Sequence, residues 1–431
     1  MVVPDTFSVQ NEAARLDQWW ISLNEESLNL IMDKALDGNL DLKNSWERLR
    51  ESRAVARVAG AELYPELDGE LGAFRGGDRT DDGVGDAETV FSAGLTASYE
   101  VDVWGRLQAV SDAEQLRAEA SYLDVQAAAL SLSAEVALTW IRLSATQDII
   151  QLLESEAKVN QDQVELLQNR FAAGQVLQVD VLRQRQLLLE TRRDLHSARS
   201  AKQQLLHQLA VLMGRPPQVN LEVEVQGLSS PGPQPETGLP ADLIRRRPDV
   251  ESAWLNLQAA NRDTAAAVSA QFPRISLSAG LNSSEDRAED LFRDWAWSFA
   301  ANLAAPLYNA GRLKAEADRR RALENQRLYE YGQSVLVAFR EVEDALVREQ
   351  EQLLRGEEVE SQLVLARQTL ERLRFSFQNG ASDFLDVLSA RTVLQRLQRE
   401  LIITRRDRLE ARIALHRALA GSFEWNGEKY E

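Results

Sequence analysis

Few residues in this chain have the types and spacing that catalysis or metal binding requires. The three histidines, His196, His207 and His416, are scattered along helix-forming stretches without the spacing of metal ligands. The absence of cysteine excludes disulfides, thiolate metal sites and cysteine nucleophiles. Most carboxylates fall at helical positions that we expect to be exposed and solvated. The sequence therefore predicts no catalytic residue, no metal site and no cofactor, and it does not predict an enzyme.

Two aspartates stand out because they recur at matched positions. Asp180 follows Gly174 by six residues, and Asp386 follows Gly380 by the same interval, 206 residues later. A glycine at these points lets the chain reverse direction. Aspartate is also a favoured helix N-cap, so each aspartate has at least a local interpretation as the cap of the helix that follows the turn.

The overall composition narrows the class of protein. The net charge of −18 argues against a nucleic-acid partner. Only 6% of the 431 residues are aromatic and 27% are charged, which suits long helices better than several compact cores. No apolar run reaches the roughly 20 residues of a transmembrane helix, and we recognise no signal peptide.

The segment from Gly105 to Gly214 organises the chain. It has no proline, and its only internal glycine is Gly174, which predicts two very long antiparallel helices joined at one turn. The first helix would be about 100 Å long at ~1.5 Å per residue. It carries two apolar seams, one through Leu116, Ala120 and Leu123 and one through Val125, Ala129 and Leu132. Two seams predict two helical neighbours, as in a barrel stave or a bundle, although a solvated coiled coil stays an alternative.

The second half of the chain repeats the first. Asp41, Trp46, Leu49 and Pro65 recur 208 residues later, and Gly105 and Gly174 recur 206 residues later as Gly311 and Gly380. A period this long indicates a tandem duplication. A proline-rich linker at about 215–240 separates two repeats, about 25–214 and 233–421.

Each repeat also contains two segments in which apolar and polar residues alternate, which predicts strands. Leu67, Leu71, Leu95, Leu277, Leu281 and Phe299 would share an apolar face, and Glu66, Asp68, Glu70, Ser276 and Asn302 a polar one. Strands of about ten residues can cross a bilayer when tilted, and the aromatic residues near their tops would form an interfacial belt. These belt residues are Phe74, Phe91, Trp295 and Trp297.

A soluble sheet with one solvated face is the alternative to a membrane barrel. Four strands leave two open edges, which lipid does not tolerate, whereas three copies would close a twelve-stranded barrel.

Three motifs resemble a known family. They are LPADLIRRRPDV at 239–250, AQFPRISL at 270–277 and YEVDVWGR at 99–106. They resemble the opening of the second repeat, the entry into the third strand and the exit from the second strand of the TolC-like outer-membrane efflux proteins. The resemblance covers nearly the whole chain and is strongest to the lipid-anchored branch, whose mature chains begin with an acylated cysteine. Since this chain has no cysteine, we expect either that Met1 replaces the anchor residue or that this member lacks an anchor.

The resemblance implies a mainly helical fold with a membrane β-barrel. Long duplicated hairpins would form a trimeric helical barrel, and four strands per chain would complete a twelve-stranded β-barrel. The protein would be the passive exit duct of a tripartite, multidrug-type efflux pump in the outer membrane of a Gram-negative bacterium. Its partners would be two further copies, a periplasmic adaptor, a proton-driven inner-membrane transporter and outer-membrane lipid. A periplasmic adaptor protein and a soluble helical scaffold are the alternatives.

In such proteins the hairpin turns close the periplasmic entrance and contact the adaptor. The resemblance assigns Asp180, Asp386, Phe377, Phe384 and Leu385 to the gate, with three copies of Asp386 forming a carboxylate ring suited to cations. It assigns the adaptor contacts to Phe171, Gly174, Gln175, Val176, Gly380, Ala381 and Ser382. Ser389 and Ser382 stand where some relatives carry a gate carboxylate and an arginine, so the closing contacts of this chain would be more apolar.

We therefore expect five kinds of segment. They are an N-terminal arm (1–24), equatorial periplasmic segments (25–64, 215–272 and 422–431), barrel strands (65–104 and 273–310), and the helical barrel (105–214 and 311–421).

Overall fold

The computed structural model describes residues 18–77, 79–80, 83–84, 88–218, 224–230, 232, 234–235, 238 and 240–419. The chain divides into two compact units. The helical unit comprises Met1–Trp46, Asp124–Val250 and Ser334–Glu431, and the strand-bearing unit comprises Glu47–Leu123 and Glu251–Gln333. Most of the expected arm and the segment 422–431 lie outside the described residues.

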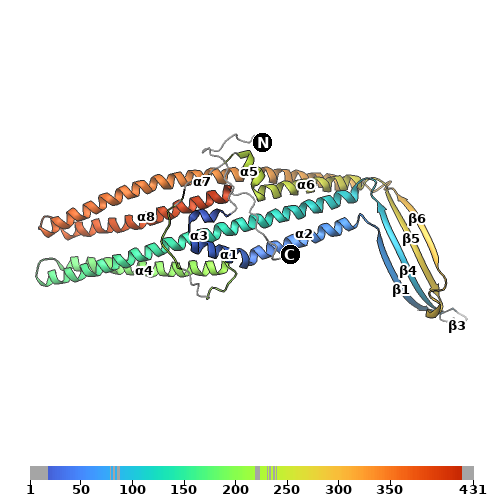
Figure 1. Cartoon of the computed structure of the whole chain (residues 1–431), viewed down its shortest axis with the longest axis horizontal. Coiled ribbons are helices and arrows are strands. Elements are labelled where there is room, and N and C mark those ends of the chain that lie inside the picture. Colours follow the sequence, from blue (N-terminus) through green and yellow to red (C-terminus); the bar gives the residue numbers. More distant parts are fainter. Residues whose placement is uncertain are drawn as a thin grey trace. The chain divides into compact units, whose positions relative to one another are not determined.

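Two long hairpins dominate the helical unit (Figure 1). The helix α3 spans Arg106–Ala172 and α4 spans Gln178–Leu212, while α7 spans Arg312–Gln378 and α8 spans Phe384–Leu419. The predicted long helices and their turns are thus confirmed. No helix in the described part of the chain is long and apolar enough to cross a membrane.

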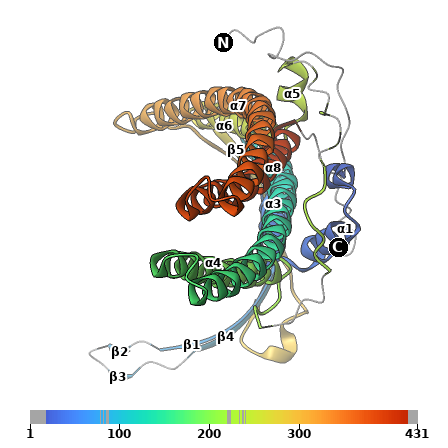
Figure 2. The same ribbon diagram turned by 90° about the vertical axis from the view of Figure 1, so that its left-hand side faces the viewer.

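Shorter helices complete the set. Figure 2 shows the two hairpins as a curved layer, with α1 and α5 on its convex side. Trp19 in the 3₁₀ helix η1 (Trp19–Leu23) is buried and donates a hydrogen bond from Nε1 to Ser133 Oγ at 3.1 Å. The short elements are η1 (Trp19–Leu23), α1 (Glu26–Gly38), α2 (Leu40–Ala61), α5 (Pro240–Arg246), α6 (Pro248–Ser269) and η2 (Ala288–Asp290).

Where α3 runs through the helical unit, side chains of both apolar seams are buried, whereas Leu116 and Leu123 in the strand-bearing unit are half-buried. Val136, Ala137, Trp140 and Ile141 are at most 1% exposed. Farther along, Ile150 and Leu153 of α3 pack on α4, and an equivalent cluster joins α7 to α8. Contacts within one chain therefore bury both seams along the helical unit, which a solvated two-stranded coiled coil would not do.

The strand-bearing unit contains an antiparallel four-stranded sheet in the order β1-β4-β5-β6. The two repeats meet at the β4–β5 pair, and β1 and β6 form the two edges. The strands are β1 (Glu66–Gly76), β4 (Glu88–Val101), β5 (Arg274–Glu285) and β6 (Ala296–Ala304), with a small ribbon of β2 (Arg79–Thr80) and β3 (Gly83–Val84). All four predicted strands are present.

Candidate functional site

Both hairpin tips turn through the same backbone motif. Gly174 and Gly380 have φ of +72° and +73°, a left-handed conformation that glycine adopts without steric cost. In both tips the N–H after the glycine donates to the carbonyl oxygen five residues earlier at 2.9 Å. The glycine N–H donates to the carbonyl three residues earlier at 2.9 and 3.1 Å. This is the Schellman arrangement that ends helices, so the predicted glycines do reverse the chain.

The aspartate after each turn lies in the first helical turn and not at the N-cap. Leu177 is the N-cap of α4, and its N–H donates to Asp180 Oδ2 at 3.2 Å. Arg183 Nη1 lies 4.0 Å from the same carboxylate. Asp180 therefore satisfies an N–H that the helix leaves free and places negative charge near the positive end of the helix dipole. The interpretation of Asp180 as the N-cap is therefore wrong by three residues, because α4 begins directly after the turn and Leu177 is its N-cap.

Asp386 occupies the equivalent position in α8 but makes no such bond. Its side chain is exposed and has no hydrogen-bond or ion-pair partner among the described residues. It lines a cavity of about 340 Å³ between α7 and α8, together with Leu373 and Ser389. A carboxylate without a local partner is free to act on an ion or on a second protein chain.

An apolar cluster holds the two tips together. Leu167 of α3 and Val181 of α4 pack against Leu370 of α7 and against Phe384 and Val387 of α8. All five side chains are less than a tenth exposed. The tip of one hairpin is thus anchored to the tip of the other inside a single chain.

The apolar residues expected at the gate differ in exposure. Phe384 is buried, and its ring centroid lies 5.7 Å from that of the half-buried Phe377. The Arg170 guanidinium lies 5.7 Å from the Phe377 ring centre, within cation–π range. Leu385 is 50% exposed. Phe377 and Phe384 therefore pack inside the chain, whereas Leu385 and Asp386 lie on its surface.

The residues expected to contact an adaptor surround the two turns. Ser382 Oγ donates to Leu373 O at 3.4 Å and so ties the second turn to its helix. Exposed positions are Phe171, Gly174, Gln175, Gly380 and Ala381, and Val176 and Ser382 are half-buried.

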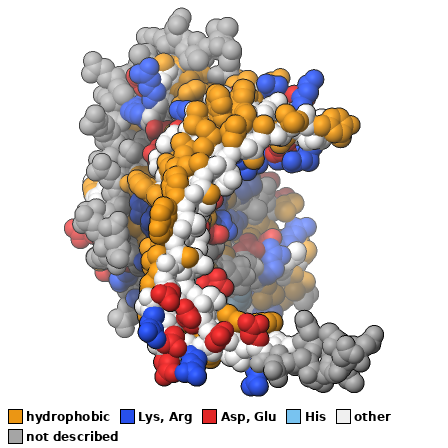
Figure 3. All heavy atoms as spheres, turned by 90° about the vertical axis from the view of Figure 1, so that its right-hand side faces the viewer, with side chains coloured by type: hydrophobic (Ala, Val, Ile, Leu, Met, Phe, Trp, Pro, Cys, Tyr) orange, Lys and Arg blue, Asp and Glu red, His pale blue; other side chains and the backbone are white. Residues whose placement is uncertain are grey.

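The strand register sorts the sheet into an apolar and a polar face. Directly paired residues share a face, and Leu67, Ala97, Ala279 and Phe299 form one cross-strand row. The next apolar row is Gly69, Leu95, Leu281 and Trp297. Figure 3 shows hydrophobic side chains that form a band across the face in view. The alternation predicted from the sequence therefore produces a continuous apolar surface.

The polar face adjoins a hollow at the base of the sheet. Glu66, Ser98, Ser276 and Asn302 line a cavity of about 620 Å³ with the ends of α2 and α3. Arg106 at the start of α3 also lines it and pairs with Glu100 at 2.9 Å. Three of the five residues expected on the polar face, Glu66, Ser276 and Asn302, thus border open space.

The four proposed belt residues do not all share a face. Phe91 pairs with Ala73 and lies on the apolar face of the sheet. Phe74, the residue after Ala73, pairs with Val90 and therefore lies on the opposite face. Trp297 is 80% exposed on the apolar face, and Trp295 is 41% exposed just before β6.

Sequence reasoning missed a second aromatic group, at the other end of the strands. The rings of Trp104 and Phe272 stack with centroids 5.0 Å apart, and Trp104 Nε1 donates to Pro273 O at 2.7 Å. Tyr64 and Tyr308 are 73% and 89% exposed close to strand ends. A search for aromatic residues at both ends of each alternating segment, and not at one end alone, would have identified this second group.

A row of buried polar residues in the hairpins was also missed. Asn160 of α3 donates from Nδ2 to Thr191 Oγ1 of α4 at 3.0 Å, and both residues are at most 2% exposed. Glu156, Gln184 and Arg391 are likewise at most 5% exposed. These residues occupy positions of the helical repeat that face a neighbouring helix, and this spacing could have predicted their burial. We expected exposure because charged residues are rarely buried.

The buried histidine of the helical unit packs against an aromatic ring. His416 is 3% exposed and stacks on Trp19 with centroids 5.4 Å apart. Burial, and then the positive charge of Arg412, lowers the pKa of His416 to about 4. In the described residues no three or more histidine or acidic side chains are grouped to hold a metal ion.

The family model for outer membrane efflux proteins matches residues 31–215 and 239–421, one match for each repeat. The chain belongs to the outer membrane efflux protein family. The pyoverdine export outer membrane protein OpmQ of Pseudomonas aeruginosa PAO1 is 34% identical over 436 residues, covering 96% of this chain and 89% of OpmQ. The cation efflux system protein CusC of Escherichia coli O6:H1 is 28% identical over 433 residues, covering 98% and 94%.

Solved structures of this family have the same fold. A crystal structure of CusC, 28% identical, superposes with a TM-score of 0.86 over 97% of each chain. The outer-membrane channel OprN, 23% identical, superposes with a TM-score of 0.90 over 98% of each chain. The mostly helical fold with four antiparallel strands is therefore that of the TolC-like channels.

Family membership settles the class of protein. The chain is an outer-membrane channel of a Gram-negative efflux system and not an enzyme. Neither the periplasmic adaptor nor the soluble scaffold remains as an alternative.

Proposed function

We propose that three copies of this chain close a single exit duct. The observation that carries the proposal is the open sheet, in which β1 and β6 each use only one edge for pairing among the described residues. Unpaired backbone groups at such edges are costly in lipid, where no water satisfies them. Four strands from each of three copies would pair all edges in a twelve-stranded barrel.

The apolar sheet face would contact outer-membrane lipid, and the polar face would line the lumen. Phe91, Trp295 and Trp297 would lie at one membrane interface with Phe74 close by, and Trp104 and Tyr308 would lie at the other. The strands of 65–104 and 273–310 would form the membrane part, and 105–214 with 311–421 the periplasmic helical barrel. Segments 25–64, 215–272 and 422–431 would form the equatorial part.

The hairpin tips would form the entrance of the duct. Leu385 and Asp386 are the exposed members of the gate set, so they would meet their counterparts from the other copies at the axis. Asp180, Phe377 and Phe384 would support the gate from within each chain. The exposed turns from Phe171 to Val176 and from Gly380 to Ser382 would contact a periplasmic adaptor.

Transport through the duct would be passive, with energy from a proton-driven inner-membrane transporter. The printed names of relatives give different cargoes, such as pyoverdine for OpmQ and cations for CusC. We therefore propose small molecules as the cargo, with selection made mainly by the transporter.

The absence of cysteine allows a direct test of barrel closure. Each double variant would carry Glu70→Cys on the β1 edge and one further cysteine on the β6 edge, at one of the positions 296 to 302. If β1 of one copy pairs with β6 of the next, at least one of these variants should give disulfide-linked trimers on denaturing gels. The matched control is Asp68→Cys with Thr96→Cys, which are paired within one chain and should leave a monomer band. A scan that gives only monomers, with the control pair oxidised, refutes the closed trimer.

A further inference from the structure

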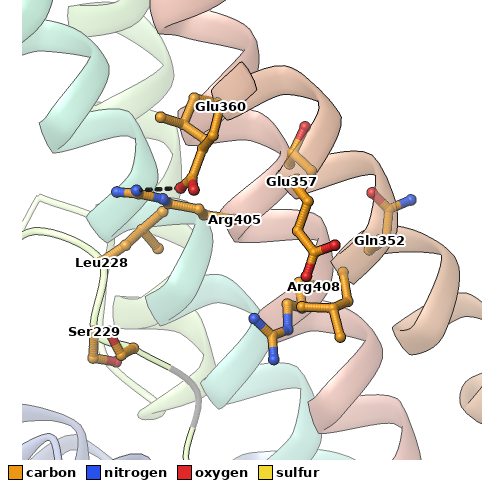
Figure 4. A pocket seen from close by; sticks show the side chains of 12 residues that line it. Leu228, Ser229, Gln352, Glu357, Glu360, Arg405 and Arg408 are labelled. Carbon is orange, nitrogen blue, oxygen red and sulfur yellow. Dashed lines mark hydrogen bonds and ion pairs between the residues drawn. The ribbon is translucent and has the colours of Figure 1, made fainter. Parts of the chain in front are cut away.

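A pocket lies in the helical unit, far along the sequence from both the tip residues and the strands. Its volume is about 300 Å³. One wall is the linker segment Leu228–Ser230, and the others are one stretch of α7 and one of α8 (Figure 4). This size is at the lower end of pockets that hold small molecules.

Three buried polar atoms of residues that line the pocket have no hydrogen-bond partner among the described residues. They are Nε of Arg408 on α8, Oε1 of Gln352 on α7 and Oγ of Ser229 in the linker. Arg408 also makes no ion pair within the described part of the chain. An unsatisfied buried donor costs free energy, and the cost is larger for a charged group. A ligand that accepts a hydrogen bond from Arg408 would remove this cost.

A carboxylate lines the same pocket as this arginine. Figure 4 shows the Glu357 carboxylate turned toward the side of Arg408, with no bond drawn between the two groups. The nearby pair of Arg405 and Glu360 is closed, at 2.9 Å. The pocket therefore presents an arginine and a carboxylate for which no ion pair is found among the described residues, beside the ion pair of Arg405 and Glu360.

Three leucines add an apolar part to the pocket wall. Leu228, Leu353 and Leu401 line the pocket together with Gly356. A Cβ at Gly356 would have Thr404 Cγ2 as its nearest neighbour, at 3.8 Å. A Cβ would fit here at ordinary van der Waals distance, and the backbone of Gly356 does not itself require glycine. A side chain longer than that of alanine would fill part of the cavity.

We propose that this pocket binds short zwitterionic molecules, namely amino acids or the ends of small peptides. The ligand carboxylate would accept a charge-assisted hydrogen bond from Arg408. The ligand ammonium group would lie against Glu357, and an apolar side chain against the three leucines. The inference concerns residues of a single chain and does not depend on closure of the trimer.

The test uses four probes on the full-length channel purified in detergent: the dipeptide Ala–Leu, its N-acetylated form, its C-terminal amide, and free leucine. Isothermal titration should show that blocking either end weakens binding by about tenfold, the effect of losing one charged contact. If Ala–Leu binds more strongly than leucine, the ligand is the end of a peptide. If leucine binds more strongly than Ala–Leu, the ligand is a free amino acid.

Matched variants assign each end of the ligand to one residue. Arg408→Gln should weaken Ala–Leu about tenfold and abolish the preference for acid over amide, while the preference for a free amine stays. Glu357→Gln should do the opposite. Gly356→Leu should weaken all probes by filling the pocket. The control Glu358→Gln alters an exposed carboxylate that does not line the pocket and should change nothing.

Two results overturn the proposal. The first is absence of measurable binding of all four probes at millimolar concentration to a channel that is folded by circular dichroism. The second is equal affinity for the free and the blocked dipeptides.

Discussion

Glu156 Oε2 of α3 and Arg399 Nη1 of α8 lie 3.5 Å apart, and the same guanidinium nitrogen lies 3.5 Å from Asp194 of α4. One arginine of the second hairpin thus faces two carboxylates of the first. Glu156 is 5% exposed, and neither of its carboxylate oxygens accepts a hydrogen bond among the described residues. Burial raises the pKa of Glu156 to about 7 against the opposing effect of Arg399.

This relationship predicts that the hairpins are less stable at alkaline pH. The folded-state pKa of about 7 lies above the ordinary value of 4.5, so the folded protein binds the proton more tightly than the unfolded chain. The stabilising effect is complete below pH 4.5 and is lost as pH rises through 7. The loss is at most about 3 kcal/mol. Urea unfolding of the purified channel at pH 5 and pH 8 should show it.

Glu156→Gln should remove this part of the pH dependence, because the amide does not titrate. The control is Glu154→Gln, where the replaced side chain is 49% exposed and pairs with Arg199. If Glu156→Gln kept the wild-type difference between pH 5 and pH 8, the assignment to Glu156 would be wrong.

Replacing Arg391 by methionine should stabilise the tips. Arg391 is 5% exposed, and its Nη1 has no hydrogen-bond partner among the described residues. Burial, and then the positive charge of Arg374, lowers the pKa of Arg391 to about 10. Replacing a poorly compensated buried charge by an apolar side chain of similar length should stabilise by about 1–3 kcal/mol.

The measurement for Arg391→Met is hydrogen exchange of the tip amides, which should slow. The control Arg396→Met changes an arginine that is 61% exposed and pairs with Glu400, and it should alter exchange little. Faster exchange in Arg391→Met than in wild type contradicts the prediction.

Asp386→Asn should weaken the cation selectivity of the duct and its block by divalent ions. Three copies of this free carboxylate at one axis would attract cations, and the amide preserves the shape without the charge. Planar-bilayer reversal potentials and calcium titrations measure the effect. The stability of the trimer should change little, because the described residues give the Asp386 side chain no partner.

Asp180→Asn serves as the matched comparison at the equivalent helical position. It weakens the charge-assisted bond to the Leu177 N–H and should cost about 0.5–1 kcal/mol of local stability, with a smaller effect on selectivity. Unchanged selectivity and divalent block in Asp386→Asn would leave the carboxylate ring without support.

Phe384→Ala and Leu385→Ala should separate packing from gating. Phe384 is buried in the cluster that joins the tips, so its truncation should cost about 3 kcal/mol and expose the tips to protease. Leu385 is half-exposed, so its truncation should leave protease resistance unchanged but raise the resting conductance of the trimer. The reverse outcome, with proteolysis following Leu385, would reject this division of roles.

Much of the fold is determined by local sequence. The alternation of Leu67, Leu71 and Leu95 with polar residues specifies strands, because successive side chains of a strand point to opposite faces. The glycines at 174 and 380 specify the turns, because their left-handed backbone suits glycine. The tandem repeat and its three motifs are sufficient to identify the family.

The tertiary structure decided what each tip residue does. Phe384 and Leu385 are neighbours in the sequence, yet Phe384 is buried in the cluster that joins the tips and Leu385 is 50% exposed. Asp180 and Asp386 hold equivalent helical positions, yet only the Asp180 side chain has a bonding partner within the described chain. Similarly, Arg408 and Glu357 border one pocket together with the linker residues Leu228–Ser230, which are far from both in the sequence. Local periodicity specifies which residues share a helix face, but which faces are covered depends on packing between segments far apart in the chain.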